Sequence, residues 1–315
     1  MENTPRGRKN KKGFWHNFFL YGSIILTVIL VGGGFWLSTV WDQVYEAVAP
    51  ETGEGNVSSG EKERDPLPDR LNVLILGLDS REQVCRADTV MLLTLNNKTG
   101  SLNIASIPRD MRVDIPGYGL DKINHAYAYG EVALTKQAVE DFLDVHIDHY
   151  ITTDFEGFVN VVDALGGIEL EVEKEMIYKG IDVNINLQPG YQPLNGEKAL
   201  EYVRWRSDAE ADLGRVKRQQ KFLKTLLQEL IAYKNILKFP RLLPEIAENI
   251  KTDLDLNQAI KLANRLKSVE IGEINTFTLP GKAGKIAGVS YILPEEEEIR
   301  QLIDVHIKGV YTEKS

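Results

Sequence analysis

"RADTVMLLTLNNKTGSLNIASIPRD" occupies residues 86–110 and holds two apolar runs, 88–96 and 101–108, joined by the turn sequence "NNKTG". A turn signal between two strand-like runs predicts an antiparallel hairpin. Both runs are almost continuously apolar instead of alternating, which is typical of strands covered on both faces. The hairpin is therefore expected inside a sheet that has a layer of structure on each side.

Strands and helices alternate through the rest of the folded part. Another apolar run, "LNVLILGL" (71–78), precedes the hairpin. Later patterns predict strands near 148–153, 168–173 and 274–280. Helical periodicity predicts helices near 131–144, 155–164, 196–202, 212–234, 240–250, 256–267 and 294–305. This order predicts the α/β class, with a mixed central β-sheet sandwiched by helices.

The N-terminal segment predicts a membrane anchor. Residues 18–40, "FFLYGSIILTVILVGGGFWLSTV", contain no charged side chain and match the roughly 20 apolar residues that cross a bilayer. Basic residues precede this span, so the N-terminus is expected in the cytoplasm. A cleaved signal peptide ending at "AVA" (47–49) is the alternative, but the apolar stretch is long for one. The expected layout is a cytoplasmic basic tail (1–17), a transmembrane helix (18–41), an extracellular stalk (42–70) and an extracellular catalytic domain (71–315).

Composition limits the function. The chain has 315 residues and a formal net charge of -9, which argues against nucleic acid as a partner. Any site for an anion must then be a local group of basic residues. Cys85 is the only cysteine, so no disulfide forms within the chain. The five histidines show no metal-ligand spacing and receive no role, although His125 lies close to Lys122.

Charged residues gather where the first three strands begin or end. If these strands are antiparallel neighbours, one edge of the sheet receives Asp79, Arg81, Arg86, Asp88, Arg109 and Asp110. Taken singly, the aspartates suit turn caps and Arg109 with Asp110 suits a surface ion pair. Taken together, two carboxylates suit Mg²⁺, and the arginines suit phosphate oxygens.

The segment 201–223 adds further basic residues. In "EYVRWRSD" (201–208), an extended backbone would point Arg204 and Arg206 to one face. Asp212 is the expected N-cap of the following helix. That helix begins with "RVKRQQKFL" (215–223), and positive charge in the first turns opposes the helix dipole. A bound phosphate at this helix N-terminus would offset the conflict.

One face of this helix changes from polar to apolar along its length. The face carries Arg215, Gln219, Phe222, Leu226 and Leu230. Together with "FEGFVNVVDAL" (155–165), it can line a groove for an amphiphile. Periodicity alone favours an ordinary core. Lys122 and Asn124 in "DKINHAYAYG" (121–130) can add a phosphate donor and an amide, or Lys122 can be a solvated lysine.

The motifs resemble one known family over most of 71–305. In order they read "GLDSR", "RADTVMLLTLN", "SIPRDMRVDIPG", "DKINHAYAYG", "ALGGIEL" and "LNGEKALEYVRWRSDAEADLGRVKRQQKFL". Their sequence and spacing are similar to those of the LytR-CpsA-Psr family of membrane-anchored cell-wall ligases. The resemblance implies a single membrane span and an external α/β/α domain.

The resemblance also implies roles for particular residues. It places the metal on Asp79 and Asp88, with Mg²⁺, or Mn²⁺ in its place, as the cofactor. The pyrophosphate head group is expected on Arg86, Arg109, Lys122, Arg204, Arg206, Arg215 and Gln219. Asp110 and Asp212 are expected to orient those arginines, and Arg109 or Asp110 to assist the nucleophile. Below the helix 212–234, the family has a tunnel for a prenyl chain.

The implied activity is a phosphotransfer. A secondary cell-wall glycopolymer, such as a teichoic acid or capsular glycan, would move from a polyprenyl-pyrophosphate carrier to peptidoglycan. A hydrolase would employ the same residues with water as the acceptor. A non-catalytic envelope regulator or lipid-binding module is the other alternative. The expected external location and the acidic charge argue against a regulator that binds DNA, and a lipid-binding module would not need two metal-binding aspartates.

Overall fold

The computed structural model describes residues 69–79, 84–96, 98–180, 184–206, 211–231, 248–255, 258–259, 262 and 274–310. The expected tail, transmembrane helix and stalk lie almost entirely outside this part of the chain, as do most of the helices expected at 240–250 and 256–267. Within the described residues, no helix has both the length and the apolar character needed to cross a membrane.

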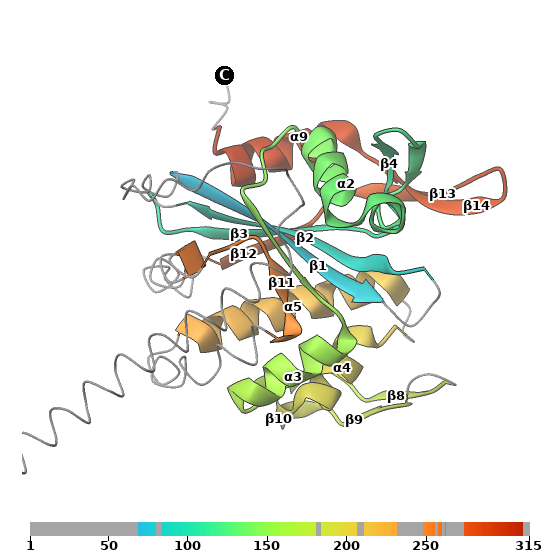
Figure 1. Ribbon diagram of the computed structural model, residues 1–315. Helices are drawn as coiled ribbons and strands as arrows, with labels where there is room; N and C mark the ends of the chain where they lie inside the picture. The colour runs from blue at the N-terminus through green and yellow to red at the C-terminus, as the bar shows by residue number, and fades with distance from the viewer. Residues whose placement is uncertain are drawn as a thin grey trace, which may run out of the picture.

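A mixed six-stranded sheet forms the centre of the domain (Figure 1). The strand order is β11-β6-β1-β2-β3-β12. Their bounds are Arg70–Asp79 for β1, Arg86–Asn96 for β2, Leu102–Ile107 for β3, His149–Thr153 for β6, Lys251–Thr252 for β11 and Ile274–Thr278 for β12. β1, β2 and β3 are antiparallel neighbours, which confirms the predicted hairpin. β6 runs parallel to β1, and β12 runs parallel to β3.

Alternating side chains of the strands enter two different cores. In β1, Leu74 and Leu76 pack in one core, whereas Leu71 and Val73 pack in the other. The first core includes residues of α2 (His125–Leu143), α9 (Glu296–Leu302) and the π-helix η2 (Ile303–Lys308). The second includes Leu227 of α5 (Ala211–Ile231). Burial on both faces explains why these strands are apolar at nearly every position.

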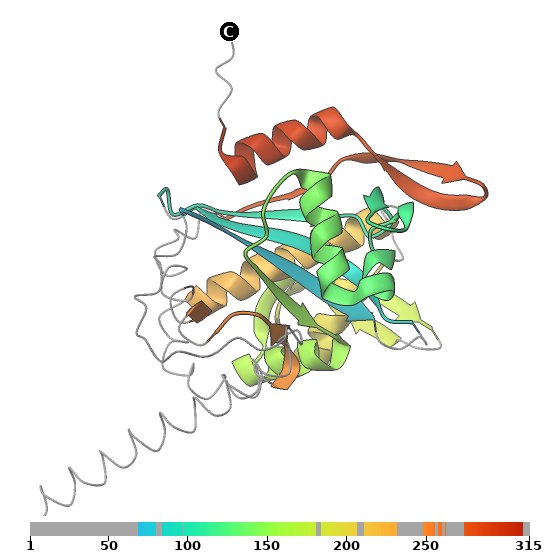
Figure 2. The ribbon, with the colours of Figure 1, turned by 45° about the horizontal axis from the view of Figure 1, so that its top comes forward.

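The helices form a layer on each side of the sheet. Figures 1 and 2 show α2 and α9 on one side and α5 on the other, with α3 (Phe155–Leu165) and α4 (Gly196–Arg204) beyond α5. The predicted sandwich is thus confirmed. The helix expected at 131–144 begins earlier, at His125, and contains a kink at Gly130 and Glu131.

A third core lies among α3, α4, α5 and two small sheets. β7 (Ile168–Val172) pairs with β10 (Gly190–Leu194), and β8 (Met176–Lys179) pairs with β9 (Asn184–Leu187). The strand expected at 168–173 therefore forms outside the central sheet. Its side chains are alternately buried and exposed, as suits a small sheet with one face in water.

Two hairpins lie beside the start of α2 (Figure 1). β4 (Arg112–Ile115) pairs with β5 (Gly119–Lys122), and β13 (Gly281–Ile286) pairs with β14 (Val289–Pro294). A bridge between Met111 and Ile292 joins the two hairpins. Their strands are too short to give a clear sequence pattern.

Candidate active site

A cavity of about 810 Å³ lies between the central sheet and the helices α3, α4 and α5. One part of its wall is charged or polar: Asp79, Arg86, Asp88, Arg109, Asp110, Lys122, Asn124, His125, Arg204, Arg206, Arg215 and Gln219. Much of the rest is apolar and includes Val73, Ile75, Met91, Leu93, Ile151, Phe158, Val161, Phe222, Leu223 and Leu226. The cavity is therefore amphipathic.

The predicted site residues come together in this cavity. Every one of them whose side chain is described lines it, although they come from five different elements and two loops. Arg81 lies outside the described residues, and so does the side chain of Asp212. α5 begins at Ala211, so Asp212 lies in its first turn and the predicted N-cap position is wrong.

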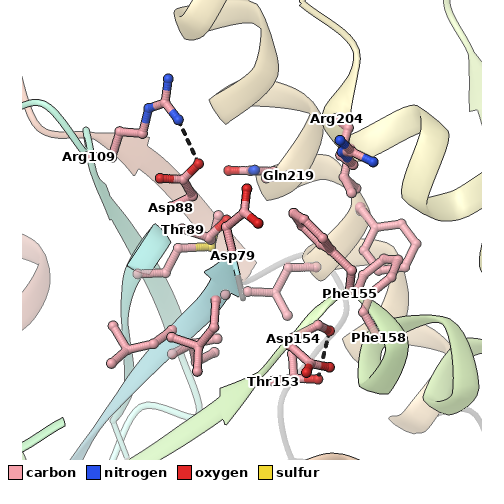
Figure 3. Close-up of a pocket in the computed structure, with 18 of the residues that line it drawn as sticks. Asp79, Asp88, Thr89, Arg109, Thr153, Asp154, Phe155, Phe158, Arg204 and Gln219 are labelled. Atoms are coloured by element: carbon pink, nitrogen blue, oxygen red, sulfur yellow. Dashed lines mark hydrogen bonds and ion pairs between the residues drawn. The ribbon is translucent and has the colours of Figure 1, made fainter. Parts of the chain in front are cut away.

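The two predicted metal ligands stand at one edge of the sheet. Asp79 is the last residue of β1 and pairs in the ladder with Arg86, the first residue of β2. Asp88 follows two residues later in β2. Figure 3 shows the carboxylates of Asp79 and Asp88 on the same side of the cavity, with the amide of Gln219 facing them.

A β-bulge turns Asp88 into the cavity. Gly77 of β1 pairs with Thr89 of β2, and Leu78 pairs with Ala87. Asp88 therefore has no partner in the ladder. Strict alternation would place Asp88 on the same face as Val90, which lies in the core under α2, and so away from the cavity. The extra residue of a bulge re-aims side chains in this way, often at functional sites.

Two ion pairs connect the loop after β3 to its surroundings, one to this edge of the sheet and one to β5. Arg109 Nη1 donates to Asp88 Oδ2 at 2.6 Å (Figure 3), and Lys122 Nζ lies 2.7 Å from Asp110 Oδ1. Arg109 Nε is 3.8 Å from Asp110 Oδ2, which links the two pairs. Asp110 thus contacts both cations, as expected of an orienting carboxylate.

Arg204 and Arg206 reach the cavity by another route than the one predicted. Residues 201–204 are helical, not extended, and Arg204 ends α4. The helix persists because Asn195 caps its start, accepting from the Lys198 amide at 3.0 Å, and because its buried face continues to Val203. Only at Trp205, the C-cap, does the backbone become extended. The Arg204 guanidinium lies 4.8 Å from the Phe155 ring centroid, a cation–π contact.

The basic residues at the start of α5 have two different roles, because Arg215 lines the cavity and Arg218 packs behind it. Arg215 and Gln219 line the cavity, and Phe222 and Leu226 do so one and two turns after Gln219. All four were predicted to lie on one face of this helix. Arg218 is nearly buried and donates to the carbonyl of Trp205 at 2.7 Å. This bond holds the segment between Arg204 and Arg206, so Arg218 positions the site.

The charged end has suitable groups for a hard cation. Asp79 and Asp88 supply carboxylate oxygens, the donors that Mg²⁺ prefers. Asn124 is 5% exposed, and its Nδ2 lies 3.5 Å from Asp88 Oδ1. In the described part of the chain, its Oδ1 is buried without a hydrogen-bond partner. Among the described residues, no group of three or more His, Cys, Asp or Glu side chains is placed to hold a metal ion. Mg²⁺ commonly takes its remaining ligands from water and substrate phosphate.

Burial and negative charge both act on the one thiol near this edge. Burial, followed by the charge of Asp79, raises the pKa of Cys85. Its thiol is therefore largely protonated at neutral pH. A thiol is also a poor ligand for Mg²⁺, which prefers oxygen donors.

Sequence reasoning missed a histidine–aspartate pair at the cavity wall. His125 lines the cavity, and its Nδ1 lies 2.8 Å from Asp121 Oδ2. Tyr129 donates to the same oxygen at 2.7 Å. Burial raises the pKa of Asp121, but hydrogen bonds from His125, Tyr129 and the Lys122 amide outweigh it and lower that pKa below its ordinary value. The spacing of Asp121 and His125, four residues apart, was the available signal.

The fold and the cavity define an α/β domain with a cavity that is cationic at one end and apolar at the other. A profile of the LytR_cpsA_psr family matches residues 42–307. The chain belongs to this family. It is similar to a protein from Oceanobacillus iheyensis named polyisoprenyl-teichoic acid–peptidoglycan teichoic acid transferase TagU, with 32% identity over 96% of each chain.

Two further likenesses agree with this assignment. Bacillus subtilis TagT, which carries the same transferase name, is 35% identical over 76% of this chain and 77% of its own length. A solved structure described as TagT bound to LIIa-WTA has a TM-score of 0.68 and 33% identity, covering 82% of this chain and 96% of that one. The mixed sheet and its helical layers are thus those of a known member.

Proposed function

We propose that this protein is a membrane-anchored phosphotransferase. It would move a wall glycopolymer, of the teichoic-acid kind, from a polyprenyl-pyrophosphate carrier to peptidoglycan, with Mg²⁺ as cofactor. The supporting observation is the cavity, because its charged end and its apolar interior match the two parts of a lipid pyrophosphate. The names of the relatives support the same chemistry.

The charged end favours an anion despite the acidity of the whole chain. Six cationic side chains line the cavity: Arg86, Arg109, Lys122, Arg204, Arg206 and Arg215. Four carboxylates accompany them: Asp79, Asp88, Asp110 and Asp154. The local excess of positive charge contrasts with the net charge of -9, so it concentrates anions at this one place. Guanidinium groups also match the geometry of phosphate oxygens.

The apolar end suits the hydrocarbon part of the carrier. Phe158 of α3 and Phe222 of α5 lie with ring centroids 5.0 Å apart, and both line the cavity. Leu223 and Leu226 continue this wall along α5. Apolar surface of this kind is stabilised when a hydrocarbon replaces water beside it. The sequence alone left open whether this face was ordinary core, and the cavity along it supports the tunnel.

The site residues have separate tasks in the proposed reaction. Asp79 and Asp88 would hold the Mg²⁺ ion, which supplies neutralisation of the pyrophosphate charge. The arginines bind and orient the pyrophosphate, and Asp110 keeps Arg109 and Lys122 in place. Positioning and charge stabilisation of this type provide most of the catalysis in phosphoryl transfer.

The chemical step joins the acceptor to the phosphorus next to the glycan. A sugar hydroxyl of the acceptor attacks that phosphorus, a new P–O bond forms, and the bond to the bridging oxygen breaks. Polyprenyl phosphate leaves with that oxygen. The hydroxyl proton passes to His125, because its Nδ1 faces the ionised Asp121 and leaves Nε2 as the accepting atom. An arginine cannot take this proton, since its guanidinium stays charged.

The N-terminal segment would anchor this domain at the outer face of the membrane. Residues 18–41 supply the apolar span, and the basic tail keeps the N-terminus in the cytoplasm. The cavity would then meet its lipid-linked donor at the membrane surface.

The test follows the fate of a labelled glycan. The full-length protein in detergent would receive Mg²⁺, a polyprenyl-pyrophosphate glycan labelled in its sugar, and peptidoglycan. We expect label bound covalently to peptidoglycan, and none with Asp79→Ala. Asp141→Ala, on the exposed face of α2, is the matched control and should retain transfer. Label released only as soluble sugar phosphate would contradict the transferase and indicate a hydrolase.

A further inference from the structure

Two stacked tyrosines stand outside the cavity, next to its charged end. Tyr118 lies between β4 and β5, and Tyr129 lies in the first turns of α2. Their rings are parallel within 9°, with centroids 4.4 Å apart. Tyr118 is 57% exposed and Tyr129 is 41% exposed. We call this pair the tyrosine platform.

The local backbone holds the platform in the solvent. Tyr118 stands between Gly117 and Gly119, whose φ angles of 82° and 74° are of the left-handed kind that glycine adopts at low cost. The Tyr118 amide donates to the Ile115 carbonyl at 2.8 Å, which closes the turn. On the other side, α2 is kinked just after Tyr129. The exposure of the rings is thus a product of the turn and the kink.

The kink itself is a strained feature. Glu131 has a φ of 51°, which is unfavourable for a residue with a side chain. Strain of this kind persists where the surrounding structure imposes it, and it is concentrated at functional sites. Here it separates the turn that carries His125 and Tyr129 from the rest of α2.

One carboxylate connects the platform to the cavity. Asp121 Oδ2 accepts from the Tyr129 hydroxyl at 2.7 Å and lies 2.8 Å from His125 Nδ1. The hydrogen bond to Asp121 raises the pKa of Tyr129, so its hydroxyl stays protonated and continues to donate. The rings of His125 and Tyr129 have centroids 6.0 Å apart. Asp121 therefore connects the cavity wall at His125 directly to the tyrosine platform at Tyr129.

We propose that the tyrosine platform binds the sugar chain of the acceptor. Sugar rings have an apolar face that stacks on aromatic rings, and their hydroxyl and N-acetyl groups bond to nearby polar atoms. The outer face of the Tyr118 ring offers such a surface. A sugar stacked there would place the next sugar of its chain toward His125 and the cavity. This inference rests on the proposed function, because it assigns a place to the acceptor of that reaction.

The donor does not explain the platform. Its pyrophosphate is accounted for by the cationic side chains in the cavity, and its hydrocarbon by the apolar wall. The platform instead presents ring faces and hydroxyl groups to solvent, beside the wall that carries His125. A long polysaccharide, which cannot enter the cavity, needs an open surface of this kind.

The test separates affinity for the acceptor from affinity for the donor. Transfer by the full-length protein in detergent would be measured while acceptor and donor are varied in turn. In parallel, binding of a β-1,4-linked N-acetylglucosamine tetramer would be measured by calorimetry, without any donor. The variants are Tyr118→Ala and Tyr118→Phe. Tyr191→Ala is the matched control, since this exposed tyrosine lies on β10 in the distant layer.

Tyr118→Ala should raise KM for the acceptor about five- to tenfold and weaken tetramer binding by a similar factor. KM for the donor should change less than about twofold, and Tyr118→Phe should restore most of the lost affinity because it keeps the ring. An unchanged acceptor KM, or a rise in donor KM instead, would overturn the inference. If wild-type protein binds the tetramer through Tyr118 but never transfers the glycan, the platform stands and the proposed function fails.

Discussion

Replacement of Arg218 by methionine tests how the cavity arginines are held. Arg218 is 3% exposed, and its Nη2 donates to the Trp205 carbonyl at 2.7 Å. Its guanidinium also lies 4.7 Å from the centre of the Trp205 ring. Methionine keeps much of the volume but offers no donor and no charge. The substitution therefore removes both contacts with Trp205, the residue that lies between Arg204 and Arg206 in the sequence.

The expected loss follows from these contacts. A buried carbonyl that loses its donor costs about 1–3 kcal/mol, and a partly desolvated cation–π contact contributes about 1–2 kcal/mol. The ion pair of Arg218 with Glu173, at 3.7 Å, adds little because the Glu173 side chain is 38% exposed. Some of the loss is offset because methionine is easier to bury. We expect the free energy of unfolding to fall by about 2–4 kcal/mol.

Urea unfolding followed by tryptophan fluorescence would measure this change. Lys217→Met is the matched control, since Lys217 is the exposed neighbour on the same helix, and it should change stability by less than about 0.5 kcal/mol. KM for the donor should also rise in Arg218→Met, because Arg204 and Arg206 lose their support. A loss below about 1 kcal/mol, with donor KM unchanged, would refute this role for Arg218.

Three shorter predictions concern other parts of the site. Mg²⁺ should speed alkylation of Cys85 at pH 8, because a cation on Asp79 would offset the negative charge that helps to raise the thiol pKa. In Asp79→Asn, Mg²⁺ should leave the alkylation rate unchanged. Ionised Asp121 contributes stability above the unfolded pKa of about 3.9 that is lost as pH falls through its lowered folded pKa, so Asp121→Asn should flatten the acid side of a stability–pH curve. Leu226→Trp should narrow the apolar end of the cavity. KM measured for a long-chain donor should therefore rise more than KM measured for a short-chain analogue.

Much of the fold could be predicted because its signals are local. The runs that form β1, β2 and β3 are apolar at nearly every position, and the turn after Asn96 predicts that β2 and β3 are antiparallel. Once β1 is also placed antiparallel to β2, Asp79, Asp88 and Arg109 must meet at one edge. Periodicity also places Arg215 and Leu226 on one face of α5, although it did not show that this face lines a cavity.

Other parts depend on contacts between distant segments and leave no local pattern. Alternation alone would point Asp88 away from the cavity, and only the bulge in the ladder corrects this. The alternating pattern around Arg204 favoured an extended backbone, but tertiary packing of Tyr202 and Val203 keeps that segment helical. The link from Asp121 to both His125 and Tyr129 likewise requires the hairpin β4–β5 to lie against α2.

The central claim is that one cavity holds both ends of a lipid pyrophosphate. Its most direct test is photo-crosslinking of the full-length protein with a polyprenyl-pyrophosphate glycan that carries a diazirine at the far end of its prenyl chain. Mass spectrometry should find the label on peptides of α3 and α5, near Phe158 and Leu226. The label should fall in Arg215→Met, because the head group would lose a binding partner. Label confined to other elements, and insensitive to Arg215→Met, would contradict the account.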